Sequence, residues 1–264
     1  MSQYDPNNPY GQNQQQPQGM PQYMGAQAAA QQYAHPMFAA DATQSERTGF
    51  IQRTYLHLGG AILAFVVLET LFLNVLVPMI GEATIIGMFS GWNMLILMGA
   101  FIGVSFLAGH WARSDASVGL QYTGLSLYIL AEAVIFMPML YIAGKFYPGS
   151  IETAGIATLA IFGGLTAFVF ISKADFSFMR GFLVVGSMAA FAVIIASIFM
   201  GGGLGIWFSG AMILLFGGYI LYDTSNIIHN YRTDQHVAAS LALFASVAML
   251  FWYVLRFVMQ MMEE

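Results

Sequence analysis

Four ionisable side chains lie inside long apolar stretches of this chain. They are Glu69, Glu132, Asp223 and Arg256. A charged group at membrane depth is costly, and residues of this kind usually serve a function. The chemistry that such isolated acids favour is the binding of a cation or a proton, so each of the four is a candidate site residue.

Asp223 is the most informative of these residues. It lies several residues before the end of an apolar segment that ends near Ile228. On a helix, Tyr219, Asn226 and Ile227 would share its face, and the Asn226 amide could donate a hydrogen bond to the carboxylate. A carboxylate held between burial and a donor can change its charge near physiological pH. The alternative is a carboxylate that only holds helices together.

The other two acids admit two readings each. Glu132 falls in the middle of an apolar segment, where it is either an ion or proton ligand or a protonated acid bonded to a neighbouring backbone carbonyl. Glu69 lies closer to the outer end of its segment, and its side chain could simply reach the membrane interface. We treat Glu132 as a candidate ion-binding residue.

Arg256 belongs to the last apolar segment, where it shares one helical face with Ser246, Met249 and Tyr253. Its long side chain favours reaching outward to the interface over pairing with Asp223. Ser246 and Arg256 would be separated by about 15 Å along the helix axis.

Composition excludes several classes of protein. Of all residues, 58% are hydrophobic and 8% are charged, too few charges to cover a water-soluble surface. The net charge of −5 does not suggest a nucleic-acid partner, and the absence of cysteine excludes disulfides and thiolate metal sites. No nucleophile elbow, histidine metal motif or phosphate-binding loop occurs. We therefore expect a non-enzymatic membrane protein without a resident cofactor.

The apolar segments predict an all-α, polytopic bundle of about seven transmembrane helices, because a span needs about 20 residues. The predicted spans are 54–78, 92–111, 118–143, 152–172, 181–200, 205–228 and 237–261. Residues 79–91 are predicted to be an interfacial loop. Gly99 and Gly103 form a small-xxx-small pattern, which favours close helix packing.

The chain divides into two predicted regions. Residues 1–45 are rich in Gln, Pro and Tyr, lack Lys and Arg, and are predicted to be a disordered tail, either a passive tether or a self-associating segment. Residues 46–264 form the transmembrane domain. The positive-inside rule places the N-terminus in the cytoplasm, with one group of six basic residues on that side. That group is Arg47, Arg53, Arg113, Lys173, Arg180 and Arg232.

Three stretches resemble the Bax inhibitor family of membrane proteins. Residues 53–58, Arg-Thr-Tyr-Leu-His-Leu, resemble the start of that family's first helix. Residues 173–178, Lys-Ala-Asp-Phe-Ser-Phe, resemble its link between helices four and five. Residues 222–228, beginning Tyr-Asp-Thr-Ser, resemble its helix-six signature, in which Tyr-Asp-Thr-Gln is usual. The order and positions of the three agree from about residue 46 to the end.

The resemblance implies a seven-helix bundle with helix seven near its centre. It also implies a calcium leak across the membrane that is gated by pH. The family's sensor is a pair of aspartates, one in helix six and one in helix seven, which can share a proton. Asp223 matches the first. Ser246 stands where the second aspartate is expected, Met249 replaces an Asn, and Arg256 falls at the family's Arg position.

The resemblance therefore suggests a calcium-permeable leak channel with an altered aspartate site. Its expected ion-binding or gating residues are Asp223, Ser246, Glu132, Asn226 and Arg256, with Asp223 as the metal ligand and calcium as the permeant ion. With one acid fewer, the site should bind calcium more weakly. The alternative is a regulator that binds a membrane-anchored protease or stress and cell-death machinery. A bacterial inner membrane is the expected location.

Overall fold

The computed structural model describes residues 38–88, 91–114, 117–200 and 203–263. Seven of the helices in these ranges are long and apolar enough to cross a membrane, as predicted, so the chain is an integral membrane protein. The first span joins α2 (Gln44–Leu71), a π-helical turn (Phe72–Leu76) and α3 (Val77–Ile80), and α4 (Glu82–Gly87) follows it. The other spans are α5 (Gly91–Ala112), α6 (Val118–Phe146), α7 (Ser150–Ser172), α8 (Met179–Met200), α9 (Ile206–His229) and α10 (His236–Glu263).

The first helix begins earlier than hydropathy predicts, at Gln44 rather than at residue 54. The Thr43 side chain accepts a hydrogen bond from the Glu46 backbone N–H, and the Glu46 carboxylate accepts one from the backbone N–H of Thr43. This reciprocal capping box satisfies amide groups that would otherwise lack partners. The added turns are polar, so an apolar window misses them.

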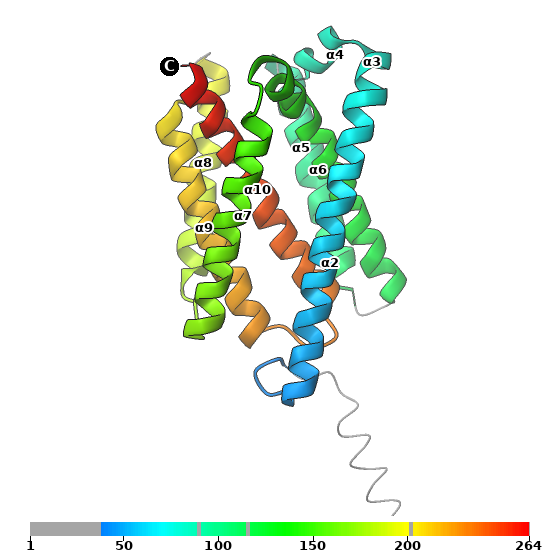
Figure 1. The fold of residues 1–264 in the computed structure, drawn as a ribbon, viewed down its shortest axis with the longest axis vertical. Helices are drawn as coiled ribbons and strands as arrows, with labels where there is room; N and C mark the ends of the chain where they lie inside the picture. The colour runs from blue at the N-terminus through cyan, green and yellow to red at the C-terminus, as the bar shows by residue number, and fades with distance from the viewer. Residues whose placement is uncertain (1–37, 89–90, 115–116, 201–202, 264) are drawn as a thin grey trace, which may run out of the picture. The chain divides into compact units, whose positions relative to one another are not determined.

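The last helix, α10, forms the centre of the bundle. In the 18-residue apolar stretch of α10, 72% of the residues are buried inside the protein, whereas the corresponding share is 11% in α5 and in α8. It packs against α9, α7, α2, α6 and α5, and Figure 1 shows it crossing between these helices. Because α10 meets other helices on nearly every side, few of its side chains remain for lipid, and the prediction of a central helix seven is confirmed.

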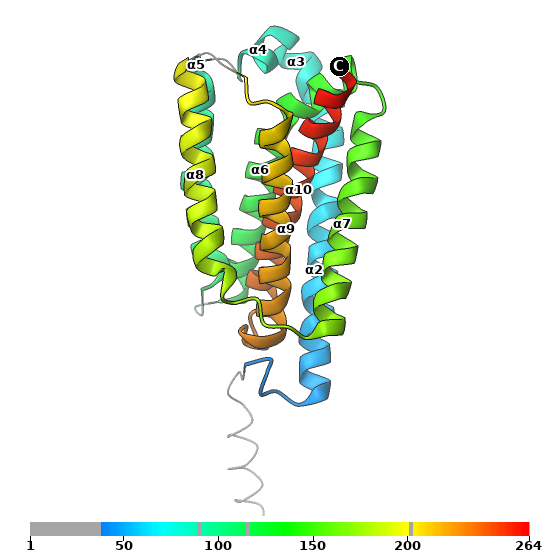
Figure 2. The ribbon, with the colours of Figure 1, turned by 90° about the vertical axis from the view of Figure 1, so that its left-hand side faces the viewer.

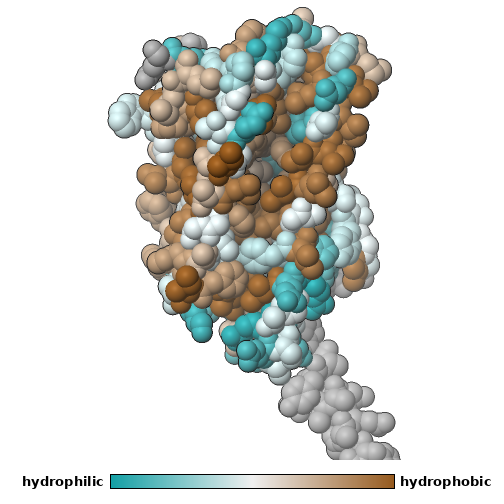
Figure 3. Space-filling model, viewed as in Figure 1, coloured by the Kyte–Doolittle hydropathy of each residue, from teal (hydrophilic) through white to brown (hydrophobic). Residues whose placement is uncertain are grey.

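The two ends of the bundle differ in charge. The group of six basic residues lies where α2, α6, α8 and α10 begin and where α5, α7 and α9 end, and we call this the basic end. Figure 3 shows hydrophobic residues over the middle of one face, with hydrophilic residues gathered toward the ends. This arrangement fits a lipid-exposed band between two aqueous interfaces.

The prediction that Gly99 and Gly103 mark a close contact between two helices is wrong. A Cβ atom at either residue would meet nothing within 4 Å. The close approach instead occurs at Gly124 of α6, where a Cβ would lie 2.5 Å from the Ala108 carbonyl oxygen and 2.7 Å from the Ala112 nitrogen. Pattern alone cannot tell which small residues face a neighbouring helix.

The segment predicted to be an interfacial loop folds into α4 at the end opposite to the basic end. Gly81, with φ of 85°, makes the sharp turn that starts it. Ile85 is fully buried against Val77 and Met137. Lys145 donates a hydrogen bond of 2.5 Å to Glu82, which lowers the pKa of that exposed carboxyl. The segment therefore packs against α6 rather than crossing the membrane.

Residues just before α2 dock at the basic end. The backbone N–H of Ala39 donates to the carbonyl of Tyr231 at 2.8 Å. Phe38 forms an isolated antiparallel β-bridge with Arg232, which lies in the turn between α9 and α10. Arg47 donates to the carbonyl of Ala39 at 2.5 Å. Most of the predicted disordered tail, residues 1–37, lies outside the described residues, so its disorder stays a prediction.

Candidate functional site

The centre of the candidate site is a buried contact between α9 and α10. Asp223 is 7% exposed and Ser246 is 6% exposed. The Ser246 hydroxyl donates a hydrogen bond of 2.5 Å to the Asp223 carboxylate. A hydrogen bond to an ionised group inside a protein is among the stronger ones. The residues that align with the two aspartates of the family resemblance therefore touch across these two helices.

Two further residues lie close enough to Asp223 to interact with its charge, and neither was predicted from the sequence as a site residue. Arg113, exposed at the end of α5, acts on Asp223 through its positive charge. Tyr231 lies half-buried in the turn after α9, and its pKa is raised by the loss of water around it and then by the negative charge of Asp223. Arg113 was visible in the sequence only as a basic residue at a helix end, which carries no information about its partner.

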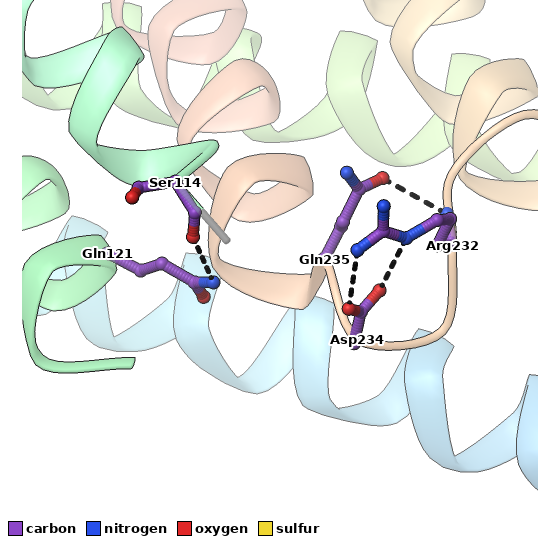
Figure 4. A network of polar contacts seen from close by, with 5 residues as sticks. All are labelled: Ser114, Gln121, Arg232, Asp234 and Gln235. Atoms are coloured by element: carbon purple, nitrogen blue, oxygen red, sulfur yellow. Dashed lines mark hydrogen bonds and ion pairs between the residues drawn. The ribbon is translucent and has the colours of Figure 1, made fainter. Parts of the chain in front are cut away.

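Polar contacts brace the turn between α9 and α10, as Figure 4 shows. Arg232 donates to both carboxylate oxygens of Asp234, at 3.1 and 2.8 Å, and lowers the pKa of that carboxyl. The backbone N–H of Arg232 donates to the side chain of Gln235 at 3.2 Å. Nearby, Gln121 of α6 donates to the carbonyl of Ser114 at 2.9 Å. The turn beside Asp223 is thus held in one geometry.

The link between α7 and α8 is fastened to the same helix as Asp223. Ser225 accepts a hydrogen bond of 2.9 Å from the backbone N–H of Phe176. The backbone N–H of Ser177 donates to Asp175 at 2.8 Å and lowers the pKa of that carboxyl. This gives a structural role to the second stretch of the resemblance, since it anchors the basic end of α9 two residues from Asp223.

Asn226 does not serve as the predicted donor to Asp223. Its side-chain oxygen instead accepts a hydrogen bond of 2.8 Å from the amide of Asn230. Both residues lie on the outer part of the same helix end, where the next turn offers a nearer partner. The donor to Asp223 comes from α10, which helical spacing within α9 could not reveal.

Arg256 does not pair with Asp223 either. Its guanidinium donates to the carbonyl of Leu204 at 2.8 Å, beside Gln260, which donates to the same oxygen at 2.7 Å. These bonds fasten the link before α9 to α10 at the end opposite to the basic end. The side chain thus turns toward the α8–α9 link, and its predicted reach to the membrane interface stays a prediction.

Glu132 lies apart from Asp223. It is fully buried on α6, and the charged group that acts with it is Glu69 of α2. Glu69 is 4% exposed, so its side chain does not reach the interface as one reading had it. Both acids are therefore buried in the core on other helices than Asp223.

A cavity of about 700 Å³ lies between the Asp223–Ser246 contact and the end opposite to the basic end, and neither residue lines it. Its lining residues come from α5, α6, α8, α9 and α10, whose course can be followed in Figure 2. Gly91, Gly203 and Arg256 line it near the end opposite to the basic end, and Met249 lines it toward the bundle's middle. Met249 is one helical turn, about 4.5 Å of rise, from Ser246.

The donor set at Asp223 is small. Within the described ranges, no three His, Asp or Glu side chains are grouped so that they could hold a metal ion. One carboxylate and one hydroxyl form a weak cation site by themselves, because calcium prefers six to eight oxygen ligands. The arrangement suits brief contact with a passing cation or proton better than tight binding.

Comparison with known proteins decides the family. The family model described as inhibitor of apoptosis-promoting Bax1 matches residues 47–263. The chain belongs to the Bax inhibitor family. A protein named Bax inhibitor 1 from Schizosaccharomyces pombe is 38% identical over 101 residues, which cover 38% of each chain.

Bacterial relatives of this Bax inhibitor family member match over longer stretches. An uncharacterized membrane protein from Vibrio cholerae is 32% identical over 158 residues, 60% of this chain and 70% of the relative. The Escherichia coli protein named modulator of FtsH protease YccA is 28% identical over 162 residues, again 60% and 70% of the two chains. These matches agree with the family that the three sequence stretches indicated.

Proposed function

We propose that this Bax inhibitor family member is a calcium-permeable leak protein of a bacterial inner membrane, with its N-terminus in the cytoplasm. Its pathway is closed where α9 meets α10, at Asp223 and Ser246. The observation that carries the proposal is a cavity lined by Met249, which lies one turn along α10 from Ser246, the residue whose hydroxyl binds the Asp223 carboxylate. A cation that passes Met249 would next meet that carboxylate.

The closed contact has a physical basis. The Ser246 hydroxyl donates a hydrogen bond to the Asp223 carboxylate, and the positive charge of Arg113 also acts on it. A cation arriving from the cavity must compete with both groups for the same carboxylate. Opening therefore requires α10 to move relative to α9 at Ser246, and Asp223 then becomes available as a ligand on the cytoplasmic side of the cavity.

Calcium efflux from liposomes containing the purified chain tests this proposal. Asp223→Asn keeps an oxygen that can accept the Ser246 hydrogen bond but removes the charge that attracts the ion. We expect efflux to fall about tenfold or more, since one charge–charge contact in a partly dry site is worth more than 1.4 kcal/mol. Asp41→Asn is the matched control, because Asp41 is exposed before α2.

An equal efflux from the Asp223→Asn and wild-type proteins would remove Asp223 from the pathway. Efflux from wild-type liposomes that does not exceed that of protein-free liposomes would reject the leak function altogether.

A second candidate function is regulation of a membrane-anchored protease. It is favoured by the name of the Escherichia coli relative, a modulator of FtsH protease. In this reading the Asp223–Ser246 bond only holds α9 to α10, and the partner surface lies elsewhere. The absence of calcium flux in the liposome assay, together with co-purification of such a protease, would favour this candidate over the first.

A further inference from the structure

The cavity beside α10 has the chemistry of a site for a hydrocarbon chain. Most of the side chains that line it are aliphatic, aromatic or Met, and they come from five helices. Two serines also line it, but Ser187 shares a hydrogen bond of 2.9 Å with the Tyr219 hydroxyl, and Ser197 donates to the carbonyl of Ile194 at 2.9 Å. Because both hydroxyls already have protein partners, the cavity offers a ligand mainly apolar contacts along its length.

The length of the cavity matches one leaflet of a bilayer. Its lining on α10 runs from Met249 to Met259, about 15 Å of rise, and on α5 from Gly91 to Ile102, about 17 Å. The hydrocarbon core of a bilayer is about 30 Å thick, so each leaflet contributes about 15 Å. The cavity volume of about 700 Å³ falls within the usual range for ligand sites, about 300–1,000 Å³. One lipid acyl chain therefore fits in length and in volume.

The cavity is accessible from the side of the bundle. Ile102 of α5 is 51% exposed and Phe191 of α8 is 44% exposed, and both residues line the cavity. Each lies near the middle of its helix, where the surroundings in a membrane are lipid chains rather than water. A chain can therefore enter the cavity from the bilayer.

Arg256 is the one charged side chain among the described residues that line this cavity. It follows the start of α10, at His236, by about 30 Å of rise, which is the thickness of the hydrocarbon core. Its guanidinium donates one hydrogen bond, to the Leu204 carbonyl, and forms no ion pair with an acid of the described residues. A guanidinium has five N–H donors in a geometry that suits a phosphate, so Arg256 can still bind an anionic group.

The surroundings of Arg256 fit the level of lipid headgroups. Trp92 and Trp207 are exposed and lie in the first turns of α5 and α9, at the end opposite to the basic end. Tryptophan is enriched at the membrane–water interface. Gly91 and Gly203 line the cavity near this end and carry no side chains that would block a headgroup.

We propose that the cavity binds one acyl chain of an anionic phospholipid, taken from the leaflet opposite to the basic end. The lipid phosphate lies on Arg256, the bound chain runs toward Met249, and the second chain remains in the bilayer beside Ile102 and Phe191. The positive charge of Arg256 favours an anionic headgroup over a zwitterionic one. The site does not rest on calcium permeation, although a chain bound there would occupy the space assigned above to the ion.

Fluorescence quenching of Trp252 in vesicles tests this proposal, because Trp252 lines the cavity. The other tryptophans, Trp92, Trp111 and Trp207, are replaced by Phe so that Trp252 is the only reporter. Bromine on a lipid chain quenches a tryptophan that it touches. When each brominated lipid is a minor component of phosphatidylcholine vesicles, we expect phosphatidylglycerol to occupy the site about fivefold more than phosphatidylcholine, the effect of one Arg on an anionic lipid.

Substitutions separate the headgroup from the chain. Arg256→Gln should lose the preference for phosphatidylglycerol, and Arg256→Lys, which keeps the charge, should retain it. Arg180→Gln is the control for charge, because Arg180 is exposed at the basic end. Ser197→Phe places a ring in the cavity and should reduce quenching by both lipids. Val193→Phe adds a ring on the same helix outside the lining and should leave quenching unchanged.

Equal quenching by the two brominated lipids in the chain with native Arg256 would overturn the proposal. Unchanged quenching in Ser197→Phe would also overturn it, since the bromine atoms would then lie outside the cavity. Quenching by a brominated fatty acid but not by brominated phosphatidylglycerol would assign the cavity to a free fatty acid instead. These results are read without any measurement of calcium efflux, so they stand apart from the test of the leak function.

Discussion

Ser246→Asp should convert the α9–α10 contact into a pH-dependent gate. The Ser246 hydroxyl is 2.5 Å from the Asp223 carboxylate, so an aspartate there would place two carboxyls within hydrogen-bond reach. At mildly acidic pH one proton is shared, and the two helices stay together. As the pH rises that proton leaves, the two negative charges repel, and α10 separates from α9.

We therefore expect calcium efflux from Ser246→Asp liposomes to rise about tenfold or more between mildly acidic and mildly alkaline pH, because like charges this close cost more than 1.4 kcal/mol. The wild type, with a single acid, should change much less. Ser246→Asn, which adds similar bulk without charge, is the control. A flat pH profile for Ser246→Asp would show that Asp223 does not control the pathway.

The largest effect on stability should come from Gly124→Ala. The added Cβ would overlap the Ala108 carbonyl oxygen and the Ala112 nitrogen, at 2.5 and 2.7 Å. Both are backbone atoms of α5, so no rotamer change relieves the overlap and the two helices must move apart. We expect a loss of about 3 kcal/mol, at the upper end of the usual cost of overpacking.

Thermal unfolding of the purified protein in detergent measures this loss. Gly99→Ala makes the same chemical change at an exposed position of α5 with nothing within 4 Å, so its melting temperature should stay near that of the wild type. Equal melting temperatures for the two variants would mean that α5 and α6 are less closely packed at Gly124 than the structure indicates.

The spans could be predicted from sequence because membrane thickness fixes their length and demands apolar side chains. The start of α2 could not, since its first turns are stabilised by the Thr43–Glu46 capping box rather than by hydrophobicity. Hydrophobicity also failed to predict α4, which was expected to be a loop. This short helix is held by the packing of Ile85 against Val77 and Met137.

The candidate site was only partly predictable. The contact of Ser246 with Asp223 followed from aligning α10 with a family pattern, not from spacing within either helix. Asn226 was chosen by helical periodicity, which describes neighbours on one helix and says nothing about the facing one. The burial of Glu69 depends on the rotation of α2 within the bundle, which no local pattern encodes.

The central claim is that the Ser246–Asp223 hydrogen bond holds the pathway closed, and calcium efflux from Ser246→Ala liposomes tests it most directly. Ser240→Ala is the matched control, because Ser240 lies on the same helix and donates only to the carbonyl of Val237. A hydrogen bond to a charged group is worth about 1.5–3 kcal/mol, so we predict efflux at least about tenfold faster from Ser246→Ala and unchanged efflux from Ser240→Ala. Equal efflux from the two variants would contradict the account.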